Sequence, residues 1–245
     1  MTYCVAMRLN AGLIFMSDTR TNAGVDNISR FRKMFTWEVP GERVITILTA
    51  GNLATSQAVI SLLDERMKAP HERRPSLLEA PTMFQVVSII GDTLKEVIKT
   101  QKMSGPESEA DYGATLIVGG QIAGIEPRLF MVYPEGNFIE ASEETPFFQI
   151  GETKYGRPIL LRAYDSDMSF EEAVKLLYVS FDSTLKANLS VGMPLDLQVV
   201  EAGAMKVAHR QRVEEDDPYF NTVSRSWGDA LKLAFQSLPD FSFDP

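Results

Sequence analysis

The chain has 245 residues, 44% of them apolar, which suits one large domain with a two-layer core. Its formal net charge is −9, and its longest basic runs are the pairs 32–33 and 73–74, so repulsion from phosphate argues against nucleic-acid binding. No apolar run reaches the ~18 residues that would suggest a membrane span, and the start lacks a signal-peptide pattern. The single cysteine, Cys4, excludes an intramolecular disulfide and leads us to expect a cytoplasmic protein.

The second residue is a threonine, and its chemistry depends on the residue before it. Once Met1 is removed, Thr2 carries both a nucleophilic hydroxyl and a general base, its own α-amino group. Such an amine titrates at about 7.7–8.0, so part of it is unprotonated at neutral pH. If Met1 is retained, the amine belongs to the wrong residue and the chain should be inert. Many unrelated proteins begin with Met-Thr, so this signal depends on its surroundings.

Two apolar runs near the start of the chain flank a short turn that ends in glycine, which predicts a β-hairpin. We expect Leu9 to face Leu13 across this hairpin. That register places Thr2 opposite Arg20, and Asp18 shares their face because side chains alternate with period two. A nucleophile, a carboxylate and a guanidinium would then meet at the open end of the hairpin. The alternative is a hairpin with a solvated, charged rim.

The run 29–37 predicts another strand, in which Lys33 shares a face with the aromatic residues Phe31, Phe35 and Trp37. A lysine in that position either extends to water along its aliphatic stem or is held near other charges. Desolvation and cationic neighbours would lower its pKa, whereas a partner such as a carboxylate would keep it charged. Next to a threonine hydroxyl, it could lower the hydroxyl's pKa or relay its proton.

A buried strand over residues 44–52 contains a glycine, Gly51, just before a predicted helix over residues 53–68. A junction of this kind leaves backbone N–H groups at the start of a helix, where they can stabilise an oxyanion. Its alternative is an ordinary tight turn.

The rest of the chain alternates runs of strands with pairs of helices, and this favours a layered α+β fold over repeated βαβ units. One further helix begins with Ser169 and Glu172, which form a capping-box pattern. The predicted helices are 82–102, 157–163 and 170–185, and the predicted strands are 114–118, 128–133, 138–141, 195–202 and 205–210.

We expect the main domain to span residues 1–213 and a C-terminal extension to span residues 214–245, acidic at first, then apolar, and helical in part. Seven large apolar residues argue against an extension that is exposed in solution: Trp227, Leu231, Leu233, Phe235, Leu238, Phe241 and Phe243. Part of it is expected to pack against an adjacent subunit. The alternative is that it folds back onto its own domain.

The sequence predicts no metal site and no cofactor. The two histidines, His71 and His209, have no ligand spacing and no partner cysteines, so they are expected to be surface or rim residues. The glycines at 119–120 and 151 are not followed by the Lys-Ser/Thr pair of a phosphate loop, and a G-x-S-x-G elbow is absent.

The order and near-spacing of Thr2, the SDTR segment 17–20, Lys33 and the Ala-Gly turn 50–51 resemble those of proteasome-type β subunits. The chain most resembles the bacterial proteasome homologue called Anbu, the ancestral β subunit. Three stretches carry this likeness: RTNAGVD at 20–26, QIGETKYG at 149–156 and NLSVGMP at 188–194.

The resemblance implies that the main domain has an N-terminal-nucleophile hydrolase fold, an αββα sandwich of two antiparallel sheets between helical layers. It implies Thr2 as the nucleophile and the Gly51 N–H as the oxyanion donor. It also implies Asp18 and Lys33 as charge partners of the nucleophile, and Arg20 as a structural support.

Relatives of this type complete the site with an aspartate and a serine after the penultimate helix. Ser190 resembles that serine, but Ala187 stands three residues before it, where the acid is expected. Either Asn188 or Asp182 would have to take the place of the acid. An asparagine could hydrogen-bond the threonine amine without supplying a charge.

Together these features predict a threonine-type hydrolase that cuts amide bonds in peptides or peptide-like substrates. The resemblance further implies self-association into a ring or an open spiral of many copies. The alternative is a non-catalytic scaffold subunit that shares the fold.

Overall fold

The computed structural model describes residues 2–22, 28–68, 75–104 and 111–243, and it contains two five-stranded antiparallel sheets. The first sheet has the order β10-β1-β2-β11-β12, and the second has the order β5-β6-β7-β8-β9. The strands of the first sheet are β1 (Tyr3–Leu9), β2 (Gly12–Asp18), β10 (Phe147–Gly151), β11 (Leu195–Glu201) and β12 (His209–Val213). Those of the second are β5 (Met34–Val39), β6 (Arg43–Gly51), β7 (Ala114–Ile122), β8 (Arg128–Val132) and β9 (Phe138–Glu140). A short ribbon pairs β3 (Arg20–Asn22) with β4 (Ile28–Arg30).

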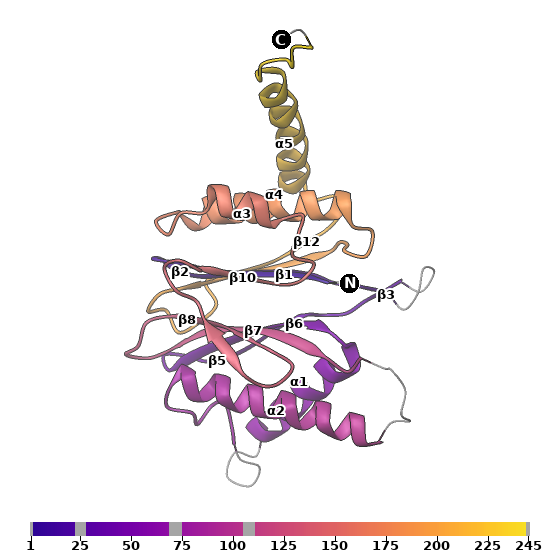
Figure 1. Ribbon diagram of the computed structural model, residues 1–245. Coiled ribbons are helices and arrows are strands. Elements are labelled where there is room, and N and C mark those ends of the chain that lie inside the picture. The colour runs from indigo at the N-terminus through magenta and orange to yellow at the C-terminus, as the bar shows by residue number, and fades with distance from the viewer. Residues whose placement is uncertain (1, 23–27, 69–74, 105–110, 244–245) are drawn as a thin grey trace.

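The sheets stack face to face, and each is covered on its outer side by a pair of helices (Figure 1). Helices α1 (Leu53–Lys68) and α2 (Met83–Ser104) cover the second sheet. Helices α3 (Arg157–Ala163) and α4 (Phe170–Ala187) cover the first. The predicted four-layer αββα sandwich is therefore confirmed, and the predicted helices lie within a few residues of their expected bounds.

Strand β2 shows how the sequence specifies these layers, because every one of its residues is buried. Ile14 and Met16 pack in the core between the first sheet and helices α3 and α4. Leu13 and Phe15 point the other way, into the core between the two sheets. A strand buried on both faces has to read as a continuous apolar run, since alternation would place polar side chains in one of the cores.

The predicted register of the first hairpin was wrong by one residue. Cys4 pairs with Ser17 and Leu9 pairs with Gly12, so the turn is shorter than expected. Gly12 belongs to β2 rather than to the turn, with φ of +143° and no room for a side chain: a Cβ there would lie 2.2 Å from the carbonyl oxygen of Val200. The shift brings Asp18 level with Tyr3, and Asp18 Oδ1 accepts a hydrogen bond from Tyr3 N at 3.0 Å.

The strand predicted over residues 29–37 is interrupted. β4 ends at Arg30, β5 begins at Met34, and Lys33 lies in the break between them. The expectation that Lys33 shares a strand face with three aromatic residues is therefore wrong. Phe31 is exposed, whereas Phe35 and Trp37 pack on the core beneath α1 and α2.

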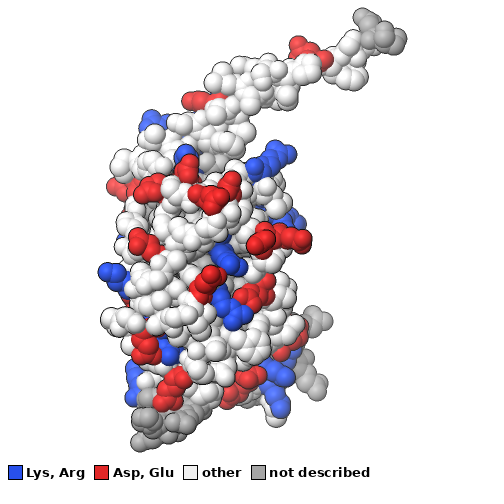
Figure 2. Space-filling view, turned by 90° about the vertical axis from the view of Figure 1, so that its left-hand side faces the viewer, with Lys and Arg blue, Asp and Glu red and all other residues white. Residues whose placement is uncertain are grey.

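The C-terminal helix α5 (Pro218–Gln236) projects away from the layers (Figure 1). Asp217 caps its first turn, and Phe220 is buried against Tyr178 of α4, with ring centroids 5.3 Å apart. From Asp229 onward the helix and the following described residues are exposed, including Leu233 and Phe235. Acidic and basic residues are interspersed over the body of the molecule, whereas the projecting end carries few charges (Figure 2).

Candidate active site

Thr2 lies at the entrance to β1, and neighbouring backbone fixes its position. Its carbonyl oxygen accepts a hydrogen bond from Glu152 N at 2.6 Å. Gly151 has φ of +82°, and a Cβ on it would lie 2.1 Å from the same oxygen, so only glycine permits this approach. Thr2 is half-buried and lines a pocket of about 340 Å³ together with Lys33 and Gly51. The structure thus brings the predicted nucleophile, lysine and oxyanion donor to one cavity.

Lys33, which lines this pocket, forms a buried ion pair with Asp18. The distance from Lys33 Nζ to Asp18 Oδ1 is 2.6 Å, and the two residues, Lys33 and Asp18, are only 3% and 0% exposed. Lys33 Nζ also donates to the carbonyl oxygen of Arg20 at 2.6 Å. Burial raises the pKa of Asp18, and the neighbouring Lys33 ammonium opposes that rise. Lys33 is therefore held near another charge rather than reaching out to water, and it lines the pocket together with Thr2.

The Arg20 guanidinium packs on the segment 189–192, and Arg20 pairs with Arg30 rather than lying opposite Thr2 across the first hairpin. Arg20 Nη1 donates to the carbonyl oxygen of Leu189 at 3.0 Å. A Cβ on Gly192 would lie 2.1 Å from Arg20 Nε, so the guanidinium packs directly on that glycine. Gly192 N in turn donates to Asp18 Oδ2 at 3.3 Å. Arg20 therefore ties the 189–192 segment to the ion pair.

Gly51 ends β6 at the wall of the pocket with φ of +104°. A Cβ at this position would lie 2.5 Å from the carbonyl oxygen of Gly113, so a side chain would both strain the backbone and collide with the residue that precedes β7. The predicted junction of strand, glycine and helix is present, with α1 beginning at Leu53.

The segment after α4 is linked to Thr2 through Glu152, a residue to which the sequence analysis gave no role. Asn188 Nδ2 donates to Glu152 Oε2 at 2.9 Å, and Asn188 Oδ1 accepts from Ser190 N at 3.0 Å. Glu152 is buried, and its own N–H holds Thr2. Of the two predicted substitutes for the family's acid, Asn188 is linked to the site in this way. Asp182 instead pairs with Lys186 on α4 at 2.9 Å and does not line the pocket.

Glu152 stands in the QIGETKYG stretch, yet no sequence pattern pointed to a role for it. The strand that precedes it, β10, was not predicted. β10 pairs with β1 in the first sheet, for example Gly151 with Tyr3, although the two strands are far apart in the sequence. Recognising β10 as a strand would have placed Glu152 beside Thr2. Ser190 is only half-buried and contributes its backbone N–H to the link.

Cys4 lies close to the nucleophile but is enclosed by the two sheets. It is fully buried, and burial raises the pKa of its thiol. We expect iodoacetamide to leave Cys4 of the folded protein unmodified and to alkylate it in denaturant, as measured by intact mass. Rapid alkylation of the folded protein would contradict this burial.

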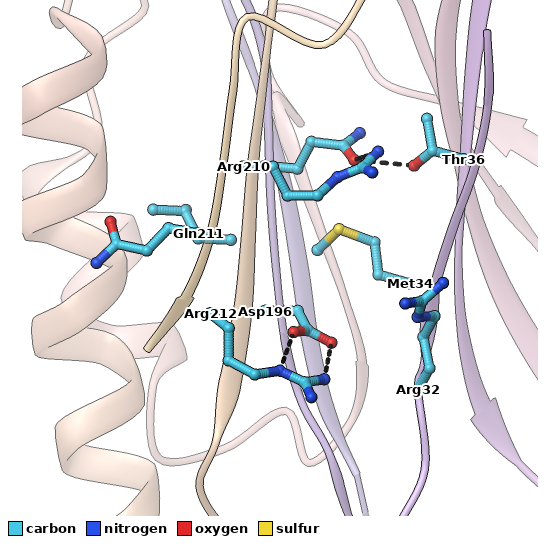
Figure 3. A pocket seen from close by; sticks show the side chains of 9 residues that line it. Arg32, Met34, Thr36, Asp196, Arg210, Gln211 and Arg212 are labelled. Carbon is cyan, nitrogen blue, oxygen red and sulfur yellow. Dashed lines mark hydrogen bonds and ion pairs between the residues drawn. The ribbon is translucent and has the colours of Figure 1, made fainter. Parts of the chain in front are cut away.

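A second pocket, of about 350 Å³, opens between β5 and strands β11 and β12 (Figure 3). Three arginines line it: Arg32, Arg210 and Arg212. Arg212 forms two hydrogen bonds with Asp196, at 2.9 and 3.1 Å. None of the residues predicted for catalysis lines this pocket.

The histidines take no part in either pocket as far as the structure describes them. His209 is exposed on β12, 3.4 Å from Gln211 Oε1, and His71 lies outside the described residues. Within the described ranges, no three His, Cys, Asp or Glu side chains are grouped as metal ligands. No helix in the same ranges is long and apolar enough to cross a membrane. Met1 and the basic pair 73–74 also lie outside the described residues.

Comparison with known proteins agrees with this geometry. Residues 2–200 match the family model described as proteasome subunit. Anbu from Hyphomicrobium sp. strain MC1 is 49% identical with a TM-score of 0.91, over 98% of this chain and 100% of that chain. Anbu from Yersinia bercovieri is 44% identical with a TM-score of 0.92, over 99% and 100%. The chain in the helical assembly of the Anbu complex from Pseudomonas aeruginosa is 45% identical with a TM-score of 0.91, over 99% of both chains.

These similarities extend over most of the chain, and the matched residues include the predicted nucleophile, the lysine and the oxyanion glycine. Because sequence and structure agree over this length, the chain belongs to the proteasome family, and within that family to the Anbu, or ancestral β-subunit, proteins.

Proposed function

We propose that this chain is a threonine-type N-terminal-nucleophile hydrolase that cuts amide bonds in peptides or peptide-like substrates. The observation that carries the proposal is the buried Asp18–Lys33 pair, whose lysine lines the same pocket as Thr2. Burying two charges costs several kcal/mol per ion before their mutual attraction offsets it, and a catalytic role for Lys33 beside Thr2 gives a reason for that cost. The non-catalytic alternative is therefore less well supported.

The reaction follows from the groups that line the pocket. After Met1 is removed, the Thr2 hydroxyl attacks the substrate carbonyl and passes its proton to the free α-amine, with Lys33 lowering the hydroxyl's pKa or relaying the proton. The Gly51 N–H stabilises the oxyanion. The C–N bond then breaks, the leaving amine takes up the proton, and an ester remains on Thr2. Water hydrolyses this ester, which releases the acid and restores the hydroxyl.

A diverse peptide pool tests this proposal even though the substrate is unidentified. The wild-type protein should generate new peptide termini that mass spectrometry detects and that are absent with the Thr2→Ala variant. Identical peptide maps for the two proteins across the pool would contradict a hydrolytic function.

We also propose that the chain forms a large homo-oligomer, a ring or an open spiral, in the cytoplasm, where a lone thiol stays reduced. The similar protein from Pseudomonas aeruginosa is described as a helical assembly. In this chain, residues 1–213 would form the hydrolase domain, and the extension 214–245 would contribute contacts between subunits. Leu233, Phe235 and Phe241 are 68%, 76% and 80% exposed, which leaves apolar surface available for a neighbouring copy.

Truncation after Glu215 should reduce or abolish this assembly, as measured by multi-angle light scattering. The single change Phe235→Glu should weaken it, because a carboxylate would have to be buried against the neighbour. The adjacent Gln236→Glu adds the same charge at an exposed position of the same helix and serves as the matched control. A monomeric full-length protein would contradict the assembly, and unchanged assembly after truncation would exclude the extension from it.

A further inference from the structure

The pocket that contains Thr2 adjoins a larger cleft of about 950 Å³. The two cavities share Ala50, Gly51 and Gly151, so the cleft begins at the wall where the oxyanion would be held. A peptide whose carbonyl group lies at Gly51 would extend a neighbouring side chain into this space. The chemistry of the cleft therefore bears on which substrates the site accepts.

One wall of the cleft is a row of lysines on α2. Lys95, Lys99 and Lys102 follow one another at spacings of four and three residues, which places them on the same face of the helix. Within the parts of the chain that the structure describes, their ammonium groups form no ion pair. Buried Ile98 and exposed Met103 give the same wall an apolar component.

The position of this wall is set by tight packing. A Cβ on Gly91 would lie 2.2 Å from the carbonyl oxygen of Gly136, so α2 touches the turn between β8 and β9 directly. That turn supplies Glu135 to the cleft, and Asp111 also lines it. Asp111 Oδ1 already accepts a hydrogen bond from Gly113 N at 2.8 Å. The described lining therefore has three ammonium groups against two carboxylates, in a chain whose net charge is −9.

We propose that this cleft is a subsite for an acidic substrate side chain, so that the enzyme prefers peptides with Glu or Asp next to the bond it cleaves. The inference rests on the proposed hydrolase function, because it takes the carbonyl at Gly51 as its reference point. Lysines at the rim of a cleft attract a carboxylate and orient it through flexible ammonium contacts, and salt weakens both effects. The preference should be about fivefold, the size expected for one or two solvent-exposed ion pairs.

The test separates binding from turnover by using the Thr2→Ala protein. Fluorescein-labelled heptapeptides of Ala and Leu carry one Glu, at each position in turn, and each has a partner with Gln at that position. Fluorescence anisotropy should show tighter binding of the Glu peptide for at least one position, and the difference should shrink as salt is added. Lys99→Glu, and separately Lys95→Gln, should remove the difference. Lys175→Glu, on exposed α4 surface away from the cleft, should preserve it.

Equal binding of every Glu and Gln pair, no binding of any peptide, or an unchanged preference in the two cleft variants would overturn the proposal. Circular dichroism of each variant excludes a folding defect as the cause of a loss. If the Glu preference is present in binding but the wild-type protein cleaves none of the peptides, the subsite stands and the hydrolase function is contradicted.

Discussion

Replacing Thr2 with Ala should abolish amide-bond hydrolysis and leave the fold and the assembly intact. The change removes the only hydroxyl that the proposed reaction uses as its nucleophile, and loss of a nucleophile from a preorganised site costs on the order of 10⁴-fold or more in turnover. The fold should survive because Thr2 is held through its backbone carbonyl, which Glu152 N contacts at 2.6 Å. Turnover of a cleaved peptide and light scattering of the same preparation provide the two readouts.

Thr2→Ser is the matched control, because it keeps both a hydroxyl and the α-amine. It should retain measurable turnover, whereas Thr2→Ala should retain none above the uncatalysed rate. Wild-type turnover in Thr2→Ala would refute the enzyme assignment. Equal loss of activity in both variants would mean that the position matters for structure rather than for its nucleophile.

Replacing Lys33 with Ala should damage both activity and stability. The change leaves the Asp18 carboxylate buried without its cation, a situation that typically destabilises a protein by about 3–5 kcal/mol. Two backbone N–H groups, from Tyr3 and Gly192, would still reach Asp18 and limit the cost. Urea denaturation measures the free energy of unfolding, and peptide hydrolysis measures the activity.

Two further variants separate the roles of this lysine. Lys33→Arg keeps the charge but should also lose activity, because a guanidinium is bulkier and does not relay a proton. The double variant Asp18→Asn with Lys33→Met removes both charges, so it should regain much of the stability without regaining activity. Wild-type activity in Lys33→Arg would exclude the proton-relay role, and full activity in the double variant would exclude the pair from catalysis.

The site could be predicted from sequence where its residues lie on strands with a clear apolar pattern. Thr2 and Asp18 border the first hairpin, and Gly51 ends a buried strand before a helix, so local rules locate these positions, although the register that put Thr2 and Asp18 on one face was wrong by one residue. The resemblance to proteasome subunits then suggested their proposed roles. The pairing between Lys33 and Asp18 was one of two options in the sequence, and the structure shows it directly.

What the sequence did not reveal depended on details outside the apolar pattern. The predicted hairpin register was wrong because Gly12 belongs to β2, where it lies against Val200, and not to the turn. The link from Thr2 to Glu152 requires β10 to pair with β1, and these two strands are far apart in the sequence. Such contacts depend on the tertiary arrangement, and no local propensity encodes them.

The most direct test of the proposed chemistry is the mass of the protein after reaction with a peptide epoxyketone, which requires a hydroxyl and a free amine on the same residue. The protein should have lost Met1 and gained one inhibitor, and peptide mapping should place the adduct on Thr2. Hydrolysis by protein that retains Met1, or a processed protein whose adduct lies on a residue other than Thr2, would contradict the proposal that Thr2 is an N-terminal nucleophile.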